Sequence, residues 1–295
     1  MIARTVLLAA AVVGLQQALP THTAVDWVRF WQDGGAVRAV VIGDSVGLGC
    51  CAAGFEKVHL TAEGDPLGSG RLTSEGQADM SIKGWATRLR ELLQSKNPNG
   101  VLVNESRDGW DTRNFLGITR KREGDPLVDV IAAVTAPPTR YDIAFISLGI
   151  NDFSHGYPYA LEEWHGIFHT NLREIVRRFK RADIVPVLVK GNDVDRMVTL
   201  ALPGWPQYMD VIDEVAAEEQ VATIDAYLAF HAAVLDAGGF PAPALMHDYL
   251  HPNQVGHDLL FAQIAIWFNR RVPRAGSPFG SMPAPVGGAL HPAWR

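Results

Sequence analysis

The sequence predicts an α/β fold in which a doubly wound, mostly parallel sheet of about five strands carries helices on both faces. Short apolar runs rich in Val and Ile alternate along the chain with longer segments of helical periodicity. The runs hold few polar residues, as in strands that are buried on both faces of a parallel sheet. With 295 residues, 47% of them hydrophobic, and no internal repeat, the chain is expected to form one large domain.

Five apolar runs are the expected strands. The first, Ala36–Gly43, stops abruptly at Asp44 and Ser45, so the serine is expected where the strand opens into a loop. Open α/β sheets bind ligands at this carboxyl edge. In the fourth run, Pro186 fits best near a strand start, because proline cannot donate a hydrogen bond to the sheet. The other runs, in chain order, are 101–103, 141–148, 184–189 and 221–224.

Helical periodicity marks most segments between these runs. The clearest helix is expected at 161–179, where apolar residues form a broad face. Residues 47–84, rich in Gly, Ser and Asp, form a long insertion directly after Ser45. Such an insertion is typical of a lid, a binding loop or a disordered surface excursion. Further helices are expected at 25–31, 85–94, 126–134, 208–219 and from near Pro252 to Phe268.

Both ends of the chain differ from the domain between them, which we place at 25–272. Residues 1–24 combine Arg4 with an apolar stretch and small residues near the end, which are the parts of a secretory signal. We therefore expect a secreted or periplasmic protein, with an uncleaved N-terminal membrane anchor or a packed helix as alternatives. Residues 273–295, rich in Pro, Gly and Ala, are expected to form a flexible tail.

The charge of the chain indicates which classes of partner to expect. The chain has 26 basic and 32 acidic residues, a net charge of −6, and no long basic stretch. Nucleic acid is therefore not an expected partner.

Cys50 and Cys51 are the only cysteines, and adjacent residues form a disulfide only in a strained ring. We expect them to be buried thiols, and nothing in the sequence indicates an oligomeric state.

Ser45 is the candidate nucleophile. A serine hydroxyl needs a base within hydrogen-bond reach, and the base needs a third group that orients it. Asp248 and His251, three positions apart before the last helix, supply such a pair on a tight turn. The alternatives are structural, since Asp44, Ser45 or His251 are also suited to capping the helices that start beside them.

Two residues are candidates for stabilising a tetrahedral oxyanion, which requires backbone N–H groups and often an amide side chain. Asn151 follows the third strand, and Gly109 lies in the loop after the second. A glycine lets a substrate approach the backbone N–H because it has no Cβ. Ordinary turn formation is the alternative role for both residues.

Together these patterns resemble the SGNH hydrolases, also called the GDSL-type esterases and lipases. The resemblance covers roughly 36–272. It departs at Val46, where the family's name motif has Leu, and at 105–108, where small residues are more usual before the glycine. The four matching blocks are Gly43-Asp44-Ser45, Gly109 in 104–109, Gly149-Ile150-Asn151-Asp152 and Asp248-Tyr249-Leu250-His251.

The resemblance implies a three-layer, flavodoxin-like α/β/α fold with Ser45 as nucleophile, His251 as base and Asp248 as the acid that orients it. It also implies an oxyanion hole formed by the Ser45 N–H, the Gly109 N–H and the Asn151 side chain. The implied reaction is ester hydrolysis through an acyl-enzyme, with no metal and no organic cofactor.

The expected substrates are small-molecule or carbohydrate esters, with short acyl groups such as acetyl. Trp110 and Phe153 are tentative substrate-binding residues, because aromatic rings stack on sugars or line acyl pockets, although core packing is their other common use. A lipase of longer chains is expected to expose an apolar entrance, and residues 47–84 are not notably apolar.

Three alternatives remain open. A metallohydrolase would use His165 and His169, four apart on a predicted helix, with His155 nearby. A noncatalytic carbohydrate-binding domain would keep the sheet and lose the serine pair. An acyltransferase would use the same acyl-enzyme and pass the acyl group to a sugar or alcohol instead of water.

Overall fold

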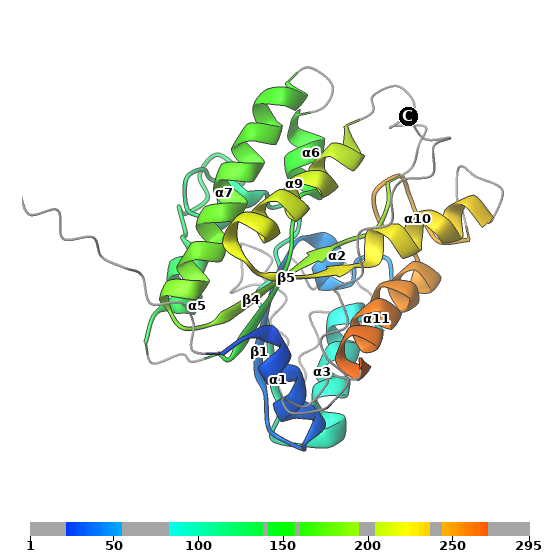
Figure 1. Ribbon diagram of the computed structural model, residues 1–295. Helices are drawn as coiled ribbons and strands as arrows, with labels where there is room; N and C mark the ends of the chain where they lie inside the picture. Colours follow the sequence, from blue (N-terminus) through cyan, green and yellow to red (C-terminus); the bar gives the residue numbers. More distant parts are fainter. Residues whose placement is uncertain are drawn as a thin grey trace, which may run out of the picture.

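The computed structural model describes residues 22–54, 83–137, 141–156, 160–194, 204–236 and 244–270. Within these ranges five parallel strands form one sheet, in the order β2-β1-β3-β4-β5, and helices cover both of its faces (Figure 1). The α/β fold predicted from the sequence is confirmed. The strands are β1 (Arg38–Gly43), β2 (Val101–Asn104), β3 (Ile143–Ser147), β4 (Val185–Lys190) and β5 (Ala222–Asp225).

The strand order makes β1 and β3 the point where the sheet reverses its winding. From β1 the chain passes to β2 on one side and then returns to β3 on the other. The crevice outside the carboxyl ends of the strands at such a point is where open α/β sheets bind ligands. Gly43, the last residue of β1, pairs in register with Ser147, the last residue of β3. The residues that follow these two strands therefore meet at this crevice.

Two groups of helices form the outer layers of a three-layer α/β/α arrangement (Figure 1). On one face α1 (Ala24–Gln32), α3 (Trp85–Lys96) and α11 (Gln254–Asn269) pack against one another. On the other face α7 (Leu161–Arg181) packs against α5 (Val130–Thr135) and α9 (Trp205–Glu219). The remaining described helices are α2 (Ser45–Leu48), α4 (Thr112–Phe115), α6 (Ile150–Gly156) and α10 (Ala226–Asp236).

The core lies between these layers and the sheet. Residues Ala39 to Ile42 of β1 have no exposed surface, and burying each of the larger side chains contributes about 1.5–3 kcal/mol. The apolar face expected at 161–179 is buried, since Phe168, Ile175 and Phe179 are 0% exposed. The strand that carries the candidate nucleophile is thus held in the most buried part of the molecule.

Capping residues explain why several helices begin later than the sequence predicts. The helix expected from residue 126 starts at Val130, because the Asp129 side chain accepts a hydrogen bond from the Ala132 N–H. The last helix starts at Gln254, because Asn253 caps it. Helix α10 was not expected: it follows β5 without a loop, and Asp225 caps it by accepting a hydrogen bond from the Leu228 N–H. Pro186 is the second residue of β4, before the β5 pairing begins at Val187, as expected for a proline.

The predictions for the two chain ends fall mostly outside the described residues. Residues 1–21 and 271–295 are not described, and neither are residues 55–82 of the long insertion. The described chain starts slightly earlier than the expected domain, since Thr23 caps α1 in a capping box with Asp26. In the described ranges no helix is long and apolar enough to cross a membrane.

Candidate active site

Ser45 lies on a sharp turn that joins β1 to α2. Asp44 caps the helix, and its Oδ1 accepts a hydrogen bond of 2.9 Å from the Val46 N–H. A side chain at either Gly43 or Gly47 would collide with the Ser106 Oγ atom. Glycine at these two positions therefore lets the loop after β2 pack directly against the turn that presents Ser45. The capping role considered for this segment is thus taken by Asp44, and Ser45 is the first residue of the helix.

The buried Asp44 carboxyl is electrostatically unusual. Burial raises its pKa to about 6, although the Val46 N–H and the nearby His251 favour the charged form. Its side chain holds the turn and does not replace Asp248 as the partner of the histidine.

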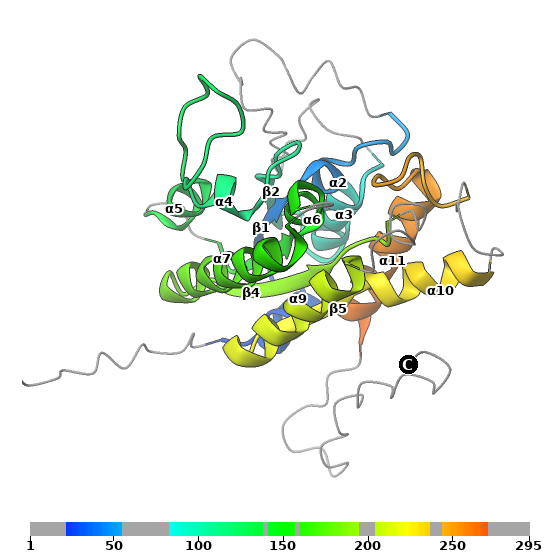
Figure 2. The same ribbon diagram turned by 90° about the horizontal axis from the view of Figure 1, so that it is seen from above.

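His251 lies between Ser45 and Asp248. Its Nε2 atom is 2.9 Å from Ser45 Oγ, and its Nδ1 atom is 2.8 Å from Asp248 Oδ2. The loop before α11 lies beside α2 in both views of the molecule (Figure 2), although 206 positions separate the serine and the histidine. The structure thus brings together the three residues that the sequence singled out, in a continuous chain of hydrogen bonds.

The loop that carries the histidine and the aspartate is fixed by its own backbone. Asp248 Oδ1 accepts hydrogen bonds from the N–H groups of Leu250 and His251, at 2.8 and 2.7 Å, and the His247 N–H donates to the His251 carbonyl. Partial burial raises the pKa of Asp248, but the hydrogen bonds from His251 and Leu250 outweigh it and hold the pKa below its ordinary value. A charged carboxylate on Nδ1 selects the tautomer in which Nε2 accepts a proton.

Asn151 and Gly109 lie on neighbouring segments at the same edge of the sheet. The Asn151 side chain donates a hydrogen bond of 2.9 Å to the carbonyl of Trp110, the residue that follows Gly109. Gly109 has a φ of +67°, a conformation that favours glycine, and Lys121 Nζ donates to its carbonyl. The Arg107 N–H donates to the Gly43 carbonyl and ties this loop to the end of β1. An amide group has two N–H donors, so the contact with Trp110 uses only one of them.

A buried polar network supports this edge and was not found from the sequence. Asp152 accepts hydrogen bonds from the Thr112 N–H and hydroxyl, and Asn171 donates to the same hydroxyl. Burial, with Asp111 nearby, raises the pKa of Asp152 to about 7. Asp111 in turn pairs with His155 at 2.9 Å. The available signal was Asp152 itself, an acidic residue shortly after an apolar strand, which is buried in the structure.

The two aromatic residues expected to contact substrate are packed in the interior. Trp110 is 3% exposed and lies edge-on to Phe115. Phe153 is 1% exposed and packs edge-on against Trp205 and Tyr208. Their packing supports the core role that aromatic residues commonly have, and gives no support to the tentative role in substrate binding.

The three histidines of the metallohydrolase alternative have separate partners. His155 pairs with Asp111, His169 pairs with Glu218 at 3.3 Å, and the His165 ring contacts the Gln207 carbonyl. Each imidazole is thus committed to a different neighbour, so this packing does not favour the metallohydrolase.

Residues 41–259 match the model of a family described as the GDSL-like Lipase/Acylhydrolase family. No curated protein sequence matches the chain.

Solved structures share the fold. An acetylxylan esterase from Geobacillus stearothermophilus superposes with a TM-score of 0.57 at 22% sequence identity, over 80% of this chain and 95% of the esterase. An alpha/beta hydrolase enzyme from the metagenome of Lake Arreo, Spain, superposes with a TM-score of 0.55 at 20% identity, over 80% of this chain and 97% of that enzyme.

Proposed function

Since this chain belongs to the GDSL-like lipase/acylhydrolase family, we propose that it is a serine esterase that hydrolyses short acyl esters through an acyl-enzyme. The observation that carries the proposal is the hydrogen-bonded chain from Ser45 through His251 to Asp248. A serine at the carboxyl end of β1, with a base and an orienting acid in line, is the arrangement that nucleophilic acyl transfer requires.

In the first half of the reaction, Ser45 Oγ attacks the ester carbonyl carbon while His251 Nε2 accepts the hydroxyl proton. Asp248 keeps the other ring nitrogen protonated and stabilises the imidazolium. The tetrahedral intermediate collapses to an acyl-enzyme when the imidazolium returns its proton to the departing alcohol. In the second half, His251 takes a proton from water as the water attacks the acyl carbon. The bond from the acyl carbon to Ser45 Oγ then breaks, the imidazolium gives its proton to Oγ, and the carboxylic acid is released.

The developing oxyanion is assigned three donors. The Ser45 N–H at the start of α2, the Gly109 N–H and the second N–H of the Asn151 amide supply them. The contact between Asn151 and the Trp110 carbonyl fixes the amide before substrate binds. Donors that need no reorganisation during the reaction are worth the most, about 2.7–4 kcal/mol for one such group.

The acyl group is proposed to be short, with acetyl esters of carbohydrates as the favoured class. A lipase of longer chains is expected to expose an apolar entrance, whereas residues 47–84, which directly follow Ser45 and Val46, are not notably apolar. The likeness to an acetylxylan esterase is consistent with this class of substrate.

The test compares hydrolysis of 4-nitrophenyl acetate and 4-nitrophenyl octanoate by the wild type and by Ser45→Ala. We expect the substitution to lower kcat by on the order of 10⁴ to 10⁶, and acetate to be the better substrate. Ser95→Ala is the matched control, because it removes the hydroxyl of an exposed serine on α3. Equal activity of Ser45→Ala and wild type would overturn the proposal, and preference for octanoate would replace the short-acyl assignment with a lipase.

A further inference from the structure

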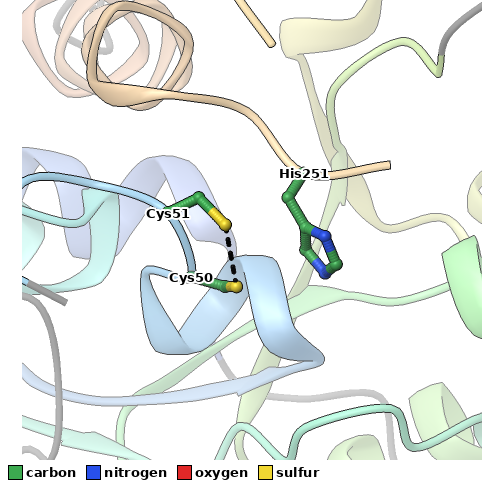
Figure 3. A group of neighbouring side chains, drawn as sticks. All are labelled: Cys50, Cys51 and His251. Atoms are coloured by element: carbon green, nitrogen blue, oxygen red, sulfur yellow. Dashed lines mark hydrogen bonds between the residues drawn. The ribbon is translucent and has the colours of Figure 1, made fainter. Parts of the chain in front are cut away.

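Two thiols lie beside the histidine of the candidate active site. Cys50 and Cys51 come after Gly49, the C-cap of α2, and the Cys50 N–H donates to the Ser45 carbonyl. The cysteines do not form a disulfide, and their Sγ atoms are 3.1 Å apart in a thiol–thiol hydrogen bond. Figure 3 shows the two sulfur atoms next to the His251 ring, which comes from the loop before α11. Nothing in the ester hydrolysis mechanism uses these thiols.

The three side chains have the geometry of a metal site. One ligand atom from each of Cys50, Cys51 and His251 lies within 4.8 Å of the others. A second set, formed by Cys51, His247 and Asp248, meets the same condition and shares Cys51. Two thiolates and an imidazole form a ligand set that Zn²⁺ commonly takes in proteins.

The two cysteine sulfur atoms would have to move only slightly to bind a tetrahedral ion. Zinc–sulfur bonds are about 2.3 Å long, so two tetrahedral thiolate ligands lie about 3.8 Å apart. From 3.1 Å, the Cys50 and Cys51 sulfur atoms would need to separate by less than about 1 Å. Cys51 has a φ of 70°, which places this bend of the chain in the left-handed region and turns its side chain away from a regular helical path.

An ion has a route to this site from solvent. Cys50 is 2% exposed, and its carbonyl accepts a hydrogen bond from the buried His257 ring, so it forms the fixed base of the site. Cys51 and His251 are half-buried, and His247 is exposed. The exposed side of Cys51 and His251 supplies a path of entry, and His247 belongs to the second set of ligand atoms, which shares Cys51.

We propose that Cys50, Cys51 and His251 bind a thiophilic divalent cation such as Zn²⁺, and that this binding inhibits the esterase. Each thiol releases its proton to solvent when it ligates the ion. Both nitrogens of His251 serve the hydrogen-bonded chain, one toward Ser45 and the other toward Asp248. Coordination by either nitrogen therefore breaks one of these two contacts and removes the base. The inhibitory part of this inference rests on the proposed function, whereas the binding part does not.

The binding test uses isothermal titration calorimetry with ZnCl₂, on full-length protein freed of metal by a chelator and kept in buffer without thiol reductants. We expect one ion per chain in the wild type. Affinity should fall by about 100-fold in Cys50→Ser/Cys51→Ser and by about 10-fold or more in Cys51→Ser, whose half-buried position tolerates the change without loss of folding. His231→Gln is the matched control, because it alters an imidazole that pairs with Asp193 elsewhere. Equal affinity in wild type and the double variant would overturn the site.

The activity test follows hydrolysis of 4-nitrophenyl acetate in the same samples. We expect loss of wild-type activity in proportion to Zn²⁺ occupancy, recovery on addition of a chelator, and no response to Mg²⁺. The double cysteine variant should match the metal-free wild type and keep its activity when Zn²⁺ is added. Full activity in a wild type that calorimetry shows to be saturated would overturn the inhibitory role. If the metal-free wild type hydrolyses no ester, the proposed function and the inhibition fail together, while calorimetry still decides the metal site.

Discussion

Two aspartate–histidine pairs in this molecule have the same separation and different surroundings. His251 Nδ1 lies 2.8 Å from Asp248, and His231 Nδ1 lies 2.8 Å from Asp193. The other nitrogen of His251 contacts the Ser45 hydroxyl, whereas the His231 ring packs beside Tyr227. An aspartate–histidine pair at this distance is therefore no sign of catalysis by itself. The contact with the Ser45 hydroxyl is what links the His251 pair to a candidate nucleophile.

The two pairs also differ in how the chain assembles them. Asp248 and His251 are three positions apart on one turn, and backbone N–H groups fix the carboxylate. Asp193 is a buried residue just after β4, and His231 reaches it from α10, 38 positions later. The first pair is therefore a local motif at the surface, and the second joins a strand end to a helix.

The largest expected difference comes from replacing the two histidines. His251→Gln removes the base and should lower kcat for 4-nitrophenyl acetate by on the order of 10⁴ to 10⁶. His231→Gln should leave kcat within about two-fold and lower the melting temperature, because the buried Asp193 loses a good partner. Steady-state kinetics and a thermal melt of each variant measure the expected changes in kcat and in melting temperature. Comparable kinetic losses in the two variants would show that the serine contact is not what matters.

Replacing the aspartates should give the next largest difference. Asp248→Asn keeps the shape of the side chain but no longer selects the tautomer with a basic Nε2, so kcat should fall by about 10⁴. Asp193→Asn should change stability and not kcat. Because residues of one triad act as a unit, Ser45→Ala/Asp248→Asn should be no slower than Ser45→Ala alone. A further loss of kcat in the double variant would mean that Asp248 has a second role, one that does not depend on its hydrogen bond to His251.

Asn151→Ala tests the oxyanion assignment and should have a smaller effect. Loss of one preorganised donor is expected to lower kcat by about 10²–10³ while KM changes little. The control is Asn114→Ala, which removes a side chain that accepts a hydrogen bond from the Asp111 N–H at the start of α4 and donates one to the Thr119 hydroxyl. Values of kcat and KM for both variants separate transition-state stabilisation from substrate binding. If Asn151→Ala changed only KM, Asn151 would not be a donor to the transition state.

The smallest effect is expected on the pH dependence of stability through Asp152. Its folded pKa of about 7 lies above the ordinary value of 3.8, so the folded protein retains a proton that the unfolded chain releases between these values. Stability should therefore fall as pH rises through this window. Asp152→Asn has no carboxyl to titrate at this position, so its stability should not fall in this way. The unfolding free energy of the variant minus that of the wild type should therefore rise by on the order of 1–3 kcal/mol from pH 5 to pH 8. Urea denaturation of both proteins at pH 5 and pH 8 measures this difference. The same difference at both pH values would show that Asp152 stays charged in the folded state.

The fold was largely predictable because the strands are uninterrupted apolar runs. All five were placed, and Pro186 was correctly expected near a strand start. The helix boundaries were less predictable, because single capping residues such as Asp129 and Asn253 decide them. Helix α10 has apolar residues around most of its circumference and follows β5 without a break, so periodicity gave no signal for it.

The residues of the candidate site were predictable where short motifs carry them. The sequence pointed to Ser45, Asp248 and His251, which lie in contact in the structure, and their catalytic roles remain a proposal. It did not predict that the Trp110 and Phe153 rings pack in the interior. It also did not predict that Cys50 and Cys51 lie beside His251, because this contact depends on the meeting of two loops that are far apart in the chain.

The most direct test of the central claim is to trap the acyl-enzyme. Wild-type protein is mixed with 4-nitrophenyl acetate and quenched in acid within milliseconds, and its peptides are analysed by mass spectrometry. We predict one acetyl group on Ser45 in the wild type, and almost none in His251→Gln under the same conditions. Acetyl on Cys51, whose thiol lies beside the same histidine, with Ser45 unmodified during turnover, would contradict the account.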